Sequence, residues 1–280
     1  MELNVMPIKN ELHRFAVMGH PVSHSLSPVI HQHFAAQFGH HIDYKKISIE
    51  EDTFEQQVKD FFNQGGQGLN ITLPAKRWAY QLCQQTTQRA RFAKAVNTLW
   101  MRDGCLHGDN TDGFGLVSDL KKHQAIHGQS ILILGAGGAV SGVIEPLLEE
   151  NPRELTIANR TVEKAYDLQR QFPQAKASSI KDLEKGYNII VHATSASLNN
   201  DELILPEAIW STHPFAYDLS YQLKGNTPFV GLARKKGCEA MDGLGMLIEQ
   251  AAESYFIWKG VRPDTKPIQK LLKEGFDNRL

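Results

Sequence analysis

The sequence has few cysteines and almost no excess of charge of either sign. Its three cysteines, Cys83, Cys105 and Cys238, are scattered without C-x-x-C spacing. Such an odd set indicates reduced thiols in a cytoplasmic protein and argues against a disulfide framework or a zinc site. Lysine plus arginine number 30 against 31 for aspartate plus glutamate, so the basic excess that phosphate-backbone binding requires is absent. We therefore expect no metal and no nucleic-acid partner.

Long apolar runs and repeats are absent as well. No apolar stretch approaches the roughly 20 residues needed to cross a bilayer. The segment Met1–Arg14 has neither the apolar core nor the cleavage site of a signal peptide. There is no internal repeat or low-complexity segment. The length of 280 residues and the 41% of hydrophobic residues predict a soluble, cytoplasmic protein of two domains.

The first half of the chain alternates between strand and helix patterns. Apolar or alternating runs predict strands at Arg14–Gly19, Tyr44–Ile49 and Leu69–Leu73. Helices are predicted over Ser27–Phe38 and Asp52–Phe62, each with its first residue as the N-cap. Repeated strand–helix–strand units favour an α/β fold with a mostly parallel sheet.

The alternation continues to the end of the chain, with one hairpin. We expect the hairpin strands Thr98–Met101 and Cys105–Gly108, the helix Asp112–Lys122, the strand Ser130–Leu134, the helix Gly138–Glu150, the strand Glu154–Ala158, the helix Thr161–Phe172, the strands Tyr187–His192 and Phe215–Leu219, and the helices Gly243–Lys259 and Lys266–Lys273.

A glycine-rich turn follows the most apolar of these strands. Ser130–Leu134 leads directly into Gly135, Ala136, Gly137, Gly138 and Ala139 and then into a helix. Glycines permit a tight turn and close approach of a pyrophosphate, and the helix start offers unpaired N–H groups and a positive dipole end. A plain strand–helix turn is the alternative. The apolar strand before it, the helix after it and a second strand about 20 residues on favour dinucleotide binding.

The end of the second strand distinguishes the two nicotinamide cofactors. NAD-selective sites place an acidic residue there to hold the ribose 2′-hydroxyl. Here the strand ends in Asn159, Arg160 and Thr161, with Lys164 one turn later and Glu163 between them. Arg160 can clamp a 2′-phosphate with paired, charge-assisted hydrogen bonds. The residue types therefore favour NADP over NAD.

Two polar segments of the first half are unusual for plain structure. The loop Gly19–Pro28 carries Ser23, Ser25 and Ser27, and hydroxyls at a helix start can bind a carboxylate without a cation. Asn70 and Thr72 share one face of a strand, and Lys76 lies just beyond its end. Taken alone, the loop would only cap its helix and Lys76 would be a solvated surface lysine.

Together with later motifs, these segments resemble the shikimate dehydrogenase family. Gly68–Lys76 is similar to its lysine motif. Its other motifs are matched, in the correct order, by Ala95–Thr98, Gly108–Gly113, Tyr217–Tyr221 with Thr227–Phe229, and Asp242–Leu247 with Gln250–Ala252. The likeness runs from about Phe15 to the end of the chain.

The resemblance implies a substrate site and a cofactor site. Lys76 and Asp112 would be the catalytic pair. Ser23 and Ser25 would hold the substrate carboxylate, with Tyr221 nearby. The ring hydroxyls would be surrounded by Asn70, Thr72, Asn97, Asp112 and Gln250. The cofactor site would comprise Gly135, Ala136, Gly137, Gly138, Ala139, Asn159, Arg160, Thr161, Lys164, Thr194, Leu219 and Gly243.

The resemblance also implies the reaction and the layout. The family transfers hydride reversibly between NADPH and the ring carbonyl of 3-dehydroshikimate, giving shikimate, on the route to aromatic amino acids. No metal is needed, because a lysine next to a carboxylate can supply the proton or positive charge. We expect a discontinuous substrate domain, 1–113 plus 246–280, and a Rossmann-like NADP-binding domain, 114–245, with a cleft between them. The protein would be a monomer or a homodimer.

Several positions depart from the family pattern. Val140 and Ser141 follow the glycine loop where a small residue and often arginine are usual. His192 replaces the usual asparagine, Ser197 stands where a glycine is expected, and Gln88 stands where an acidic residue is expected. These changes bear on cofactor affinity more than on the reaction.

Other functions remain open at this point. One is a quinate/shikimate dehydrogenase paralogue that uses NAD, against which Arg160 argues. Another is a catalytically silent, metabolite-binding regulator, against which the presence of Lys76 and Asp112 argues. A folate-type dehydrogenase of similar architecture fits less well with the serine-rich loop and Gln250.

Overall fold

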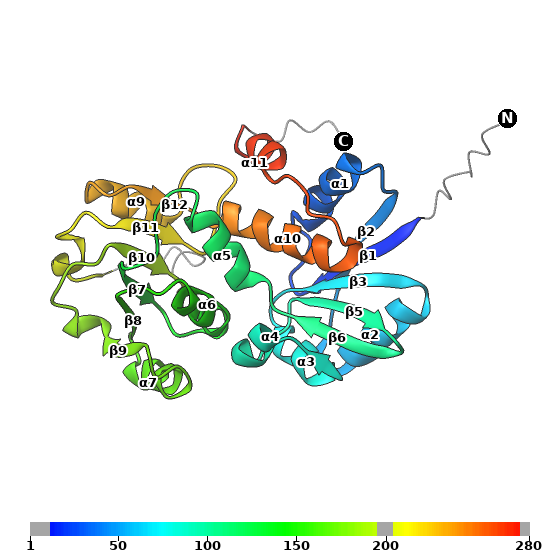
Figure 1. Cartoon of the computed structure of the whole chain (residues 1–280), viewed down its shortest axis with the longest axis horizontal. Helices are drawn as coiled ribbons and strands as arrows, with labels where there is room; N and C mark the ends of the chain where they lie inside the picture. Colours follow the sequence, from blue (N-terminus) through cyan, green and yellow to red (C-terminus); the bar gives the residue numbers. More distant parts are fainter. Residues whose placement is uncertain (1–11, 195–203, 275–280) are drawn as a thin grey trace.

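The chain forms two lobes, each built on a six-stranded sheet (Figure 1). The structure is a computed structural model and describes residues 12–194 and 204–274. The first sheet has the strand order β2-β1-β3-β5-β6-β4 and the second the order β12-β11-β10-β7-β8-β9. The predicted α/β fold is confirmed.

The first lobe contains the parallel strands and the hairpin. Its elements are β1 (His13–Gly19), α1 (Ser27–Gln37), β2 (Ile42–Ser48), α2 (Phe54–Asn63), β3 (Gly66–Ile71), α3 (Lys76–Leu82), β4 (Gln85–Thr86), α4 (Gln88–Ala93), β5 (Thr98–Arg102) and β6 (Cys105–Asp109). β1 lies between β2 and β3 and is parallel to both, whereas β5 is antiparallel to β3 and to β6. The carboxyl ends of β1 and β3 therefore lie at the same edge of the sheet.

The second lobe is a purely parallel sheet with helices around it. Its elements are β7 (Ser130–Leu134), α6 (Gly138–Glu149), β8 (Glu154–Asn159), α7 (Val162–Gln171), β9 (Lys176–Ser179), β10 (Ile189–His192), β11 (Phe215–Asp218), α9 (Pro228–Lys235) and β12 (Ala240–Met241). Every pairing in this sheet is parallel. β7 is buried on both faces, as its unbroken apolar run predicts.

Two helices run between the lobes and cross at close range. They are α5 (Asp112–Leu120) and α10 (Leu244–Lys259), with α11 (Lys266–Lys273) packed nearby (Figure 1). A Cβ atom at Gly115 of α5 would lie 2.6 Å from the carbonyl oxygen of Met246 and 2.8 Å from Cβ of Gln250. A Cβ at Gly113 would collide with α6 at the Gly142 carbonyl and Pro146. These glycines let α5 pack directly against the backbones of both α10 and α6.

Element boundaries differ from the predicted ones in a few places. β2 begins at Ile42 and β3 spans Gly66–Ile71, so both start earlier than the sequence pattern indicates. Asp52 lies in a 3-10 turn, Glu51–Thr53, and makes no cap hydrogen bond to α2. Ser27 is the first residue of α1 rather than its cap. The short helices α3 and α4 and the strands β9 and β12 were not predicted.

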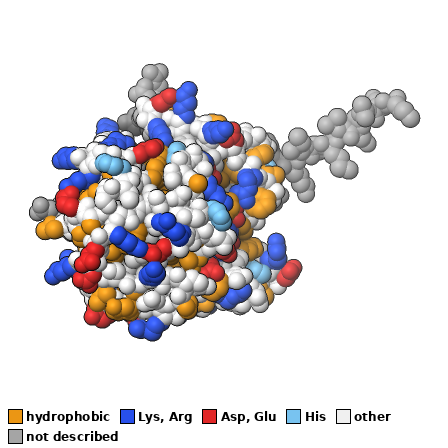
Figure 2. Space-filling view, turned by 60° about the vertical axis from the view of Figure 1, so that its left-hand side comes forward, with side chains coloured by type: hydrophobic (Ala, Val, Ile, Leu, Met, Phe, Trp, Pro, Cys, Tyr) orange, Lys and Arg blue, Asp and Glu red, His pale blue; other side chains and the backbone are white. Residues whose placement is uncertain are grey.

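The surface and the thiols agree with the composition. Basic and acidic side chains are interspersed over the face seen in Figure 2, as the balance of 30 against 31 charges leads one to expect. The three cysteines are free thiols, as predicted. In the described parts of the chain, no helix is long and apolar enough to span a membrane.

We predict that Gly115→Ala lowers the free energy of unfolding by about 1–3 kcal/mol, because the methyl group overpacks the α5–α10 crossing. The matched control is Gly231→Ala in α9, where a Cβ atom would meet nothing within 4 Å. The control should gain up to about 1 kcal/mol from helix propensity. Urea denaturation of both variants measures the difference, and equal effects would contradict the close packing of α5.

Candidate active site

A cavity of about 250 Å³ opens between the two lobes. Its walls come from the β1–α1 loop, the end of β3, the starts of α3 and α5, the end of β11 and α10. Ten predicted site residues line it: Ser25, Asn70, Thr72, Lys76, Asn97, Asp112, Leu219, Tyr221, Gly243 and Gln250. Ser23 is exposed and does not line it, and the Ser23 carbonyl instead accepts a hydrogen bond from Lys46. His24 and Ser27 do line it, although neither was predicted as a site residue.

Lys76 and Asp112 form an ion pair inside this cavity. Each begins a helix, α3 and α5 respectively. Nζ of Lys76 donates to Oδ2 of Asp112 over 2.6 Å, and the two side chains are 23% and 10% exposed. The start of α5 stabilises the Asp112 carboxylate through the helix dipole. The ammonium group of Lys76 therefore lies at the cavity wall, where the nearly buried carboxylate of Asp112 holds it.

Asn97 holds the second oxygen of Asp112. Its Nδ2 donates to Oδ1 of Asp112 over 2.8 Å and lies 3.2 Å from Oε1 of Gln250. Its Oδ1 accepts hydrogen bonds from the backbone N–H of Thr111 and the hydroxyl of Thr98, both over 2.9 Å. Both oxygens of Asp112 are therefore occupied, and the carboxylate has one orientation.

Asn70 is fixed by residues from three other elements. Its Oδ1 accepts from the Tyr44 hydroxyl over 2.6 Å, and its Nδ2 donates to the Asn97 carbonyl and to Oγ of Ser254, both over 3.1 Å. Burial raises the pKa of Tyr44 well above its ordinary value, so this hydroxyl stays protonated and remains a donor. His31 stacks on Tyr44, and burial lowers the pKa of His31 to about 3.

Sequence reasoning missed these supporting residues for identifiable reasons. Thr98 and Thr111 lie within the quoted motifs and could have been named with them. Ser254 lies one helical turn after Gln250 on α10, a spacing that places both side chains on one face. No signal pointed to Tyr44, because its strand, β2, is brought to β3 only across β1.

The serine-rich loop forms a turn that ends at the cavity. Oγ of Ser25 donates to Oγ of Ser27 over 3.2 Å and accepts from the Ser27 backbone N–H. Across the cavity, burial raises the pKa of Tyr221, and Asp242 adds to that rise. Serine hydroxyls from the first lobe and the protonated hydroxyl of Tyr221 from the second therefore belong to residues that line the same cavity.

The glycine turn leaves open space at the start of a helix. Gly135 has φ +122°, a conformation that favours glycine, and a Cβ there would lie 2.9 Å from the Ala193 carbonyl oxygen. A Cβ at Gly137 or Gly138 would meet nothing within 4 Å, so open space lies above the turn. No side chain caps the start of α6. Backbone N–H groups at a helix start next to open space suit a phosphate group.

Basic side chains stand at the end of the neighbouring strand. The backbone N–H of Gly135 donates to the Ala158 carbonyl over 2.8 Å, so the ends of β7 and β8 are adjacent. Asn159 is fixed by a hydrogen bond from its Nδ2 to the Thr161 carbonyl. The side chains of Arg160 and Lys164 are exposed and make no hydrogen bond or ion pair within the part of the chain that the structure describes. Both cations are free to meet an anionic ligand.

Leu219 and Gly243 connect the end of the second sheet to the cavity. The Gly243 N–H donates to the Ser220 carbonyl over 2.9 Å, and a Cβ at Gly243 would collide with the Leu219 carbonyl. Both residues line the cavity that holds Lys76 and Asp112. The carboxyl end of the second sheet therefore borders the cavity of Lys76 and Asp112.

The departures from the family pattern occupy different environments. Val140 is fully buried in the core of the second lobe. Oγ of Ser141 donates to the Ala93 carbonyl over 3.1 Å and so ties α6 to α4. His192 is fully buried, Gln88 is exposed at the start of α4, and Ser197 lies outside the described residues.

Comparison with known proteins identifies the family. Three family models match in order: a shikimate dehydrogenase substrate binding domain at residues 17–99, a shikimate/quinate 5-dehydrogenase at 119–206, and a shikimate 5′-dehydrogenase C-terminal domain at 243–273. The shikimate dehydrogenase (NADP(+)) of Legionella pneumophila strain Lens is 54% identical over 262 residues, covering 94% of this chain and 99% of that one. The chain belongs to the shikimate dehydrogenase family.

Other members of the shikimate dehydrogenase family agree with this assignment. The shikimate dehydrogenase (NADP(+)) of Hahella chejuensis is 48% identical, over 93% of this chain and 98% of its own. The crystal structure of shikimate 5-dehydrogenase from Thermus thermophilus in complex with NADP(H) and shikimate superimposes with a TM-score of 0.85. Its identity is 30%, over 94% of this chain and 99% of that one.

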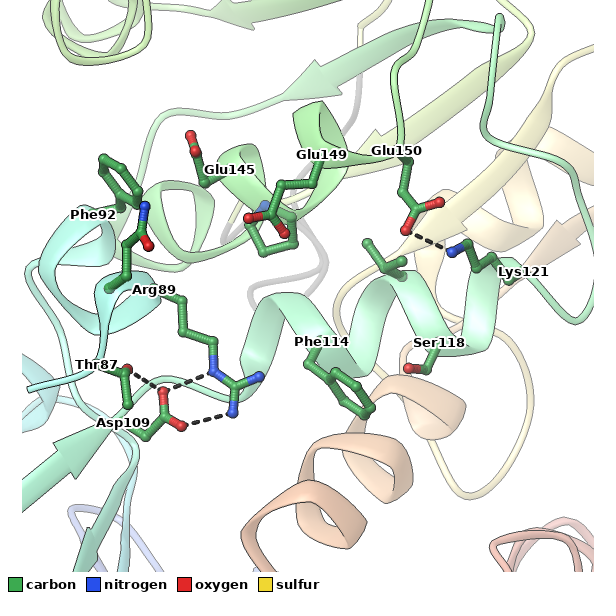
Figure 3. Close-up of a pocket in the computed structure, with 13 residues that line it drawn as sticks. Thr87, Arg89, Phe92, Asp109, Phe114, Ser118, Lys121, Glu145, Glu149 and Glu150 are labelled. Atoms are coloured by element: carbon green, nitrogen blue, oxygen red, sulfur yellow. Dashed lines mark hydrogen bonds and ion pairs between the residues drawn. The ribbon is translucent and has the colours of Figure 1, made fainter. Parts of the chain in front are cut away.

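Behind the active site of this shikimate dehydrogenase family member lies a second cavity of about 510 Å³, between α4, α5 and α6 (Figure 3). Phe114, Ser118 and Lys121 line it from the face of α5 opposite Asp112. At its edge, Arg89 binds both oxygens of the buried Asp109 over 2.7 and 2.8 Å. This pairing anchors the segment that leads into Asp112.

We predict that Arg89→Met lowers the free energy of unfolding by about 3–5 kcal/mol, since it leaves the Asp109 carboxylate buried without its cation. Adding Asp109→Asn should recover part of this loss. The control is Lys121→Met in the same cavity, where Lys121 is 52% exposed and pairs with Glu150. An exposed pair contributes under about 1 kcal/mol. Urea unfolding compares the three variants, and similar losses for Arg89→Met and Lys121→Met would refute the anchoring role.

Proposed function

We propose that this chain catalyses the reversible, NADPH-dependent reduction of 3-dehydroshikimate to shikimate, in the biosynthesis of aromatic amino acids. The observation that carries the proposal is the Lys76–Asp112 pair, 2.6 Å apart, in a cavity whose far wall is the end of the nucleotide-binding sheet. The Legionella and Hahella relatives carry the name shikimate dehydrogenase (NADP(+)). The three free thiols support a place in the cytoplasm.

The proposed chemistry rests on charge at the developing alkoxide. NADPH, when bound, supplies the hydride. Nζ of Lys76 hydrogen-bonds the carbonyl oxygen and gives it a proton or a compensating positive charge as the alkoxide forms. Asp112 keeps this ammonium group in place through Oδ2, while Asn97 fixes Oδ1. In the reverse direction the neutral amine of Lys76 takes the proton from the substrate hydroxyl, while the hydride returns to NADP⁺.

The remaining cavity residues orient the substrate. Ser25 and Tyr221, with Ser27 beside them, bind the carboxylate through neutral hydroxyls. Asn70, Thr72 and Gln250 stand around the ring hydroxyls, together with Asn97. Because Asn70 and Asn97 are each held by several hydrogen bonds, the site is organised before the substrate arrives. Ser23 does not line the cavity, and its role is to shape the loop that carries Ser25.

The residues proposed to bind the substrate and those proposed to bind NADPH divide the chain into two domains. Residues 1–113 and 246–280 form the substrate domain, and residues 114–245 form the NADP-binding domain. The pyrophosphate lies on the turn from Gly135 to Ala139. The 2′-phosphate meets Arg160 and Lys164, with Asn159 and Thr161 shaping the strand end. Thr194, Leu219 and Gly243 border the nicotinamide end.

The NAD-using paralogue and the silent regulator are less well supported. Arg160 and Lys164 stand free where an NAD site has a carboxylate. A regulator has no need of the Lys76–Asp112 ion pair, which is fully formed here.

Initial rates of NADP reduction at 340 nm with shikimate test the proposal. Lys76→Met should lower kcat by about 10²–10⁴-fold with little change in KM for NADP. The control is Lys59→Met, which removes an exposed lysine paired with Glu55 and should leave kcat unchanged. Binding of shikimate without turnover by the wild-type protein would favour the silent regulator.

Arg160→Gln should raise KM for NADP by about 10- to 100-fold and leave KM for NAD unchanged, because only NADP carries the phosphate that a charge-assisted hydrogen bond would hold. Arg170→Gln, near the other end of α7, is the control and should change neither constant. Equal effects of Arg160→Gln on both cofactors would exclude a 2′-phosphate contact and revive the NAD alternative.

A further inference from the structure

A buried polar chain connects the ends of β10 and β11 and takes no part in the chemistry above. His192, the last residue of β10, has no exposed surface. Its Nδ1 lies 3.1 Å from Oδ1 of Asp218, and its Nε2 lies 2.6 Å from Oγ1 of Thr194. Thr227, at the start of α9, donates from its hydroxyl to Oδ2 of Asp218 over 2.6 Å. The imidazole therefore joins Asp218 to Thr194.

The partners of Asp218 determine which nitrogen of His192 carries the proton. Asp218 also accepts a hydrogen bond from the Ser220 backbone N–H at Oδ1, over 3.1 Å. A carboxylate can only accept, so Nδ1 of the imidazole is the donor to it. In the tautomer that carries its only proton on Nδ1, Nε2 is an acceptor, and the Thr194 hydroxyl donates its proton to it. Phe229 stacks on the ring at 4.6 Å and fixes its plane.

Thr194 stands beside the glycine turn of the cofactor site. The Ala193 N–H donates to the Leu134 carbonyl over 2.8 Å, which holds this segment against the end of β7. A Cβ atom at Gly135 would lie only 3.3 Å from Cγ2 of Thr194. The rotamer of Thr194 therefore affects the shape of the wall next to the turn.

We propose that His192 is a positioning residue for NADPH: it accepts the Thr194 proton and so holds the Thr194 oxygen at the cofactor site as a hydrogen-bond acceptor in a single rotamer. This inference rests on the function proposed above. The family pattern has asparagine at this position. An asparagine amide reaches about as far as Nδ1 but not as far as Nε2, so it can contact Asp218 without holding Thr194.

A double-mutant cycle on NADPH affinity tests the proposal. The dissociation constant for NADPH is measured by fluorescence titration for wild type, His192→Asn, Thr194→Val and the double variant. Each single substitution should raise the dissociation constant for NADPH about three- to tenfold, because that is the effect of losing one hydrogen bond. The double variant should be no weaker than the weaker single variant, because both changes remove the same contact.

His192→Gln is the conservative variant, since its longer side chain can bring an acceptor oxygen to the position of Nε2. It should restore the dissociation constant to within about twofold of wild type. Thermal unfolding of each variant separates stability from affinity. Three outcomes would each overturn the positioning role. The first is additive effects in the cycle, and the second is an unchanged NADPH affinity in Thr194→Val. The third is an equal loss of NADPH affinity in His192→Asn and His192→Gln.

The wild-type protein distinguishes failure of this inference from failure of the proposed function. If wild type binds NADPH and oxidises shikimate but the cycle is additive, only the role of His192 is wrong. If wild type neither binds NADPH nor turns over shikimate, the proposed function is wrong, and the inference falls with it.

Discussion

The close packing of α5 against two backbones is the constraint on which the rest of the structure depends. Gly115 lets α5 touch α10, and Gly113 lets it touch α6, so one helix holds both lobes in register. Asp112 opens this helix and Gln250 lies at its crossing with α10. The contact that joins the lobes thus also places Asp112 and Gln250, for which we propose a catalytic and a substrate-binding role. A change in this contact would alter stability and site geometry together.

The site is built from strand ends and helix starts, with hydrogen bonds between side chains that are distant in the sequence. Asn97 ties the start of α5 to α10 through Asp112 and Gln250. Asn70 ties β3 to β2 and α10 through Tyr44 and Ser254. Buried amides with several partners have few alternative orientations. The cavity therefore keeps its polar groups aimed without the help of a ligand.

Much of this arrangement could be predicted from the sequence, because short motifs determine strands, turns and helix starts through interactions between neighbouring residues. The apolar run Ser130–Leu134 before the glycines predicted a buried parallel strand and the turn after it, and both are present. What could not be predicted depends on tertiary contacts. Tyr44 meets Asn70 only because β1 brings β2 and β3 together. Asp52 has the right residue type for a cap, yet the chain forms a 3-10 turn there first. Ser23 belongs to the loop that borders the cavity, but it is exposed and does not line the cavity.

The cavity behind α5 means that this helix borders open space on two of its faces. Asp112 faces the smaller cavity, and Phe114, Ser118 and Lys121 face the larger one (Figure 3). Each cavity has walls from both lobes. At the larger one, the hydrogen bond from Ser141 to the Ala93 carbonyl joins α6 to α4. The boundary between the lobes is therefore a partition one helix thick with a cavity on each side, and not a continuous packed layer.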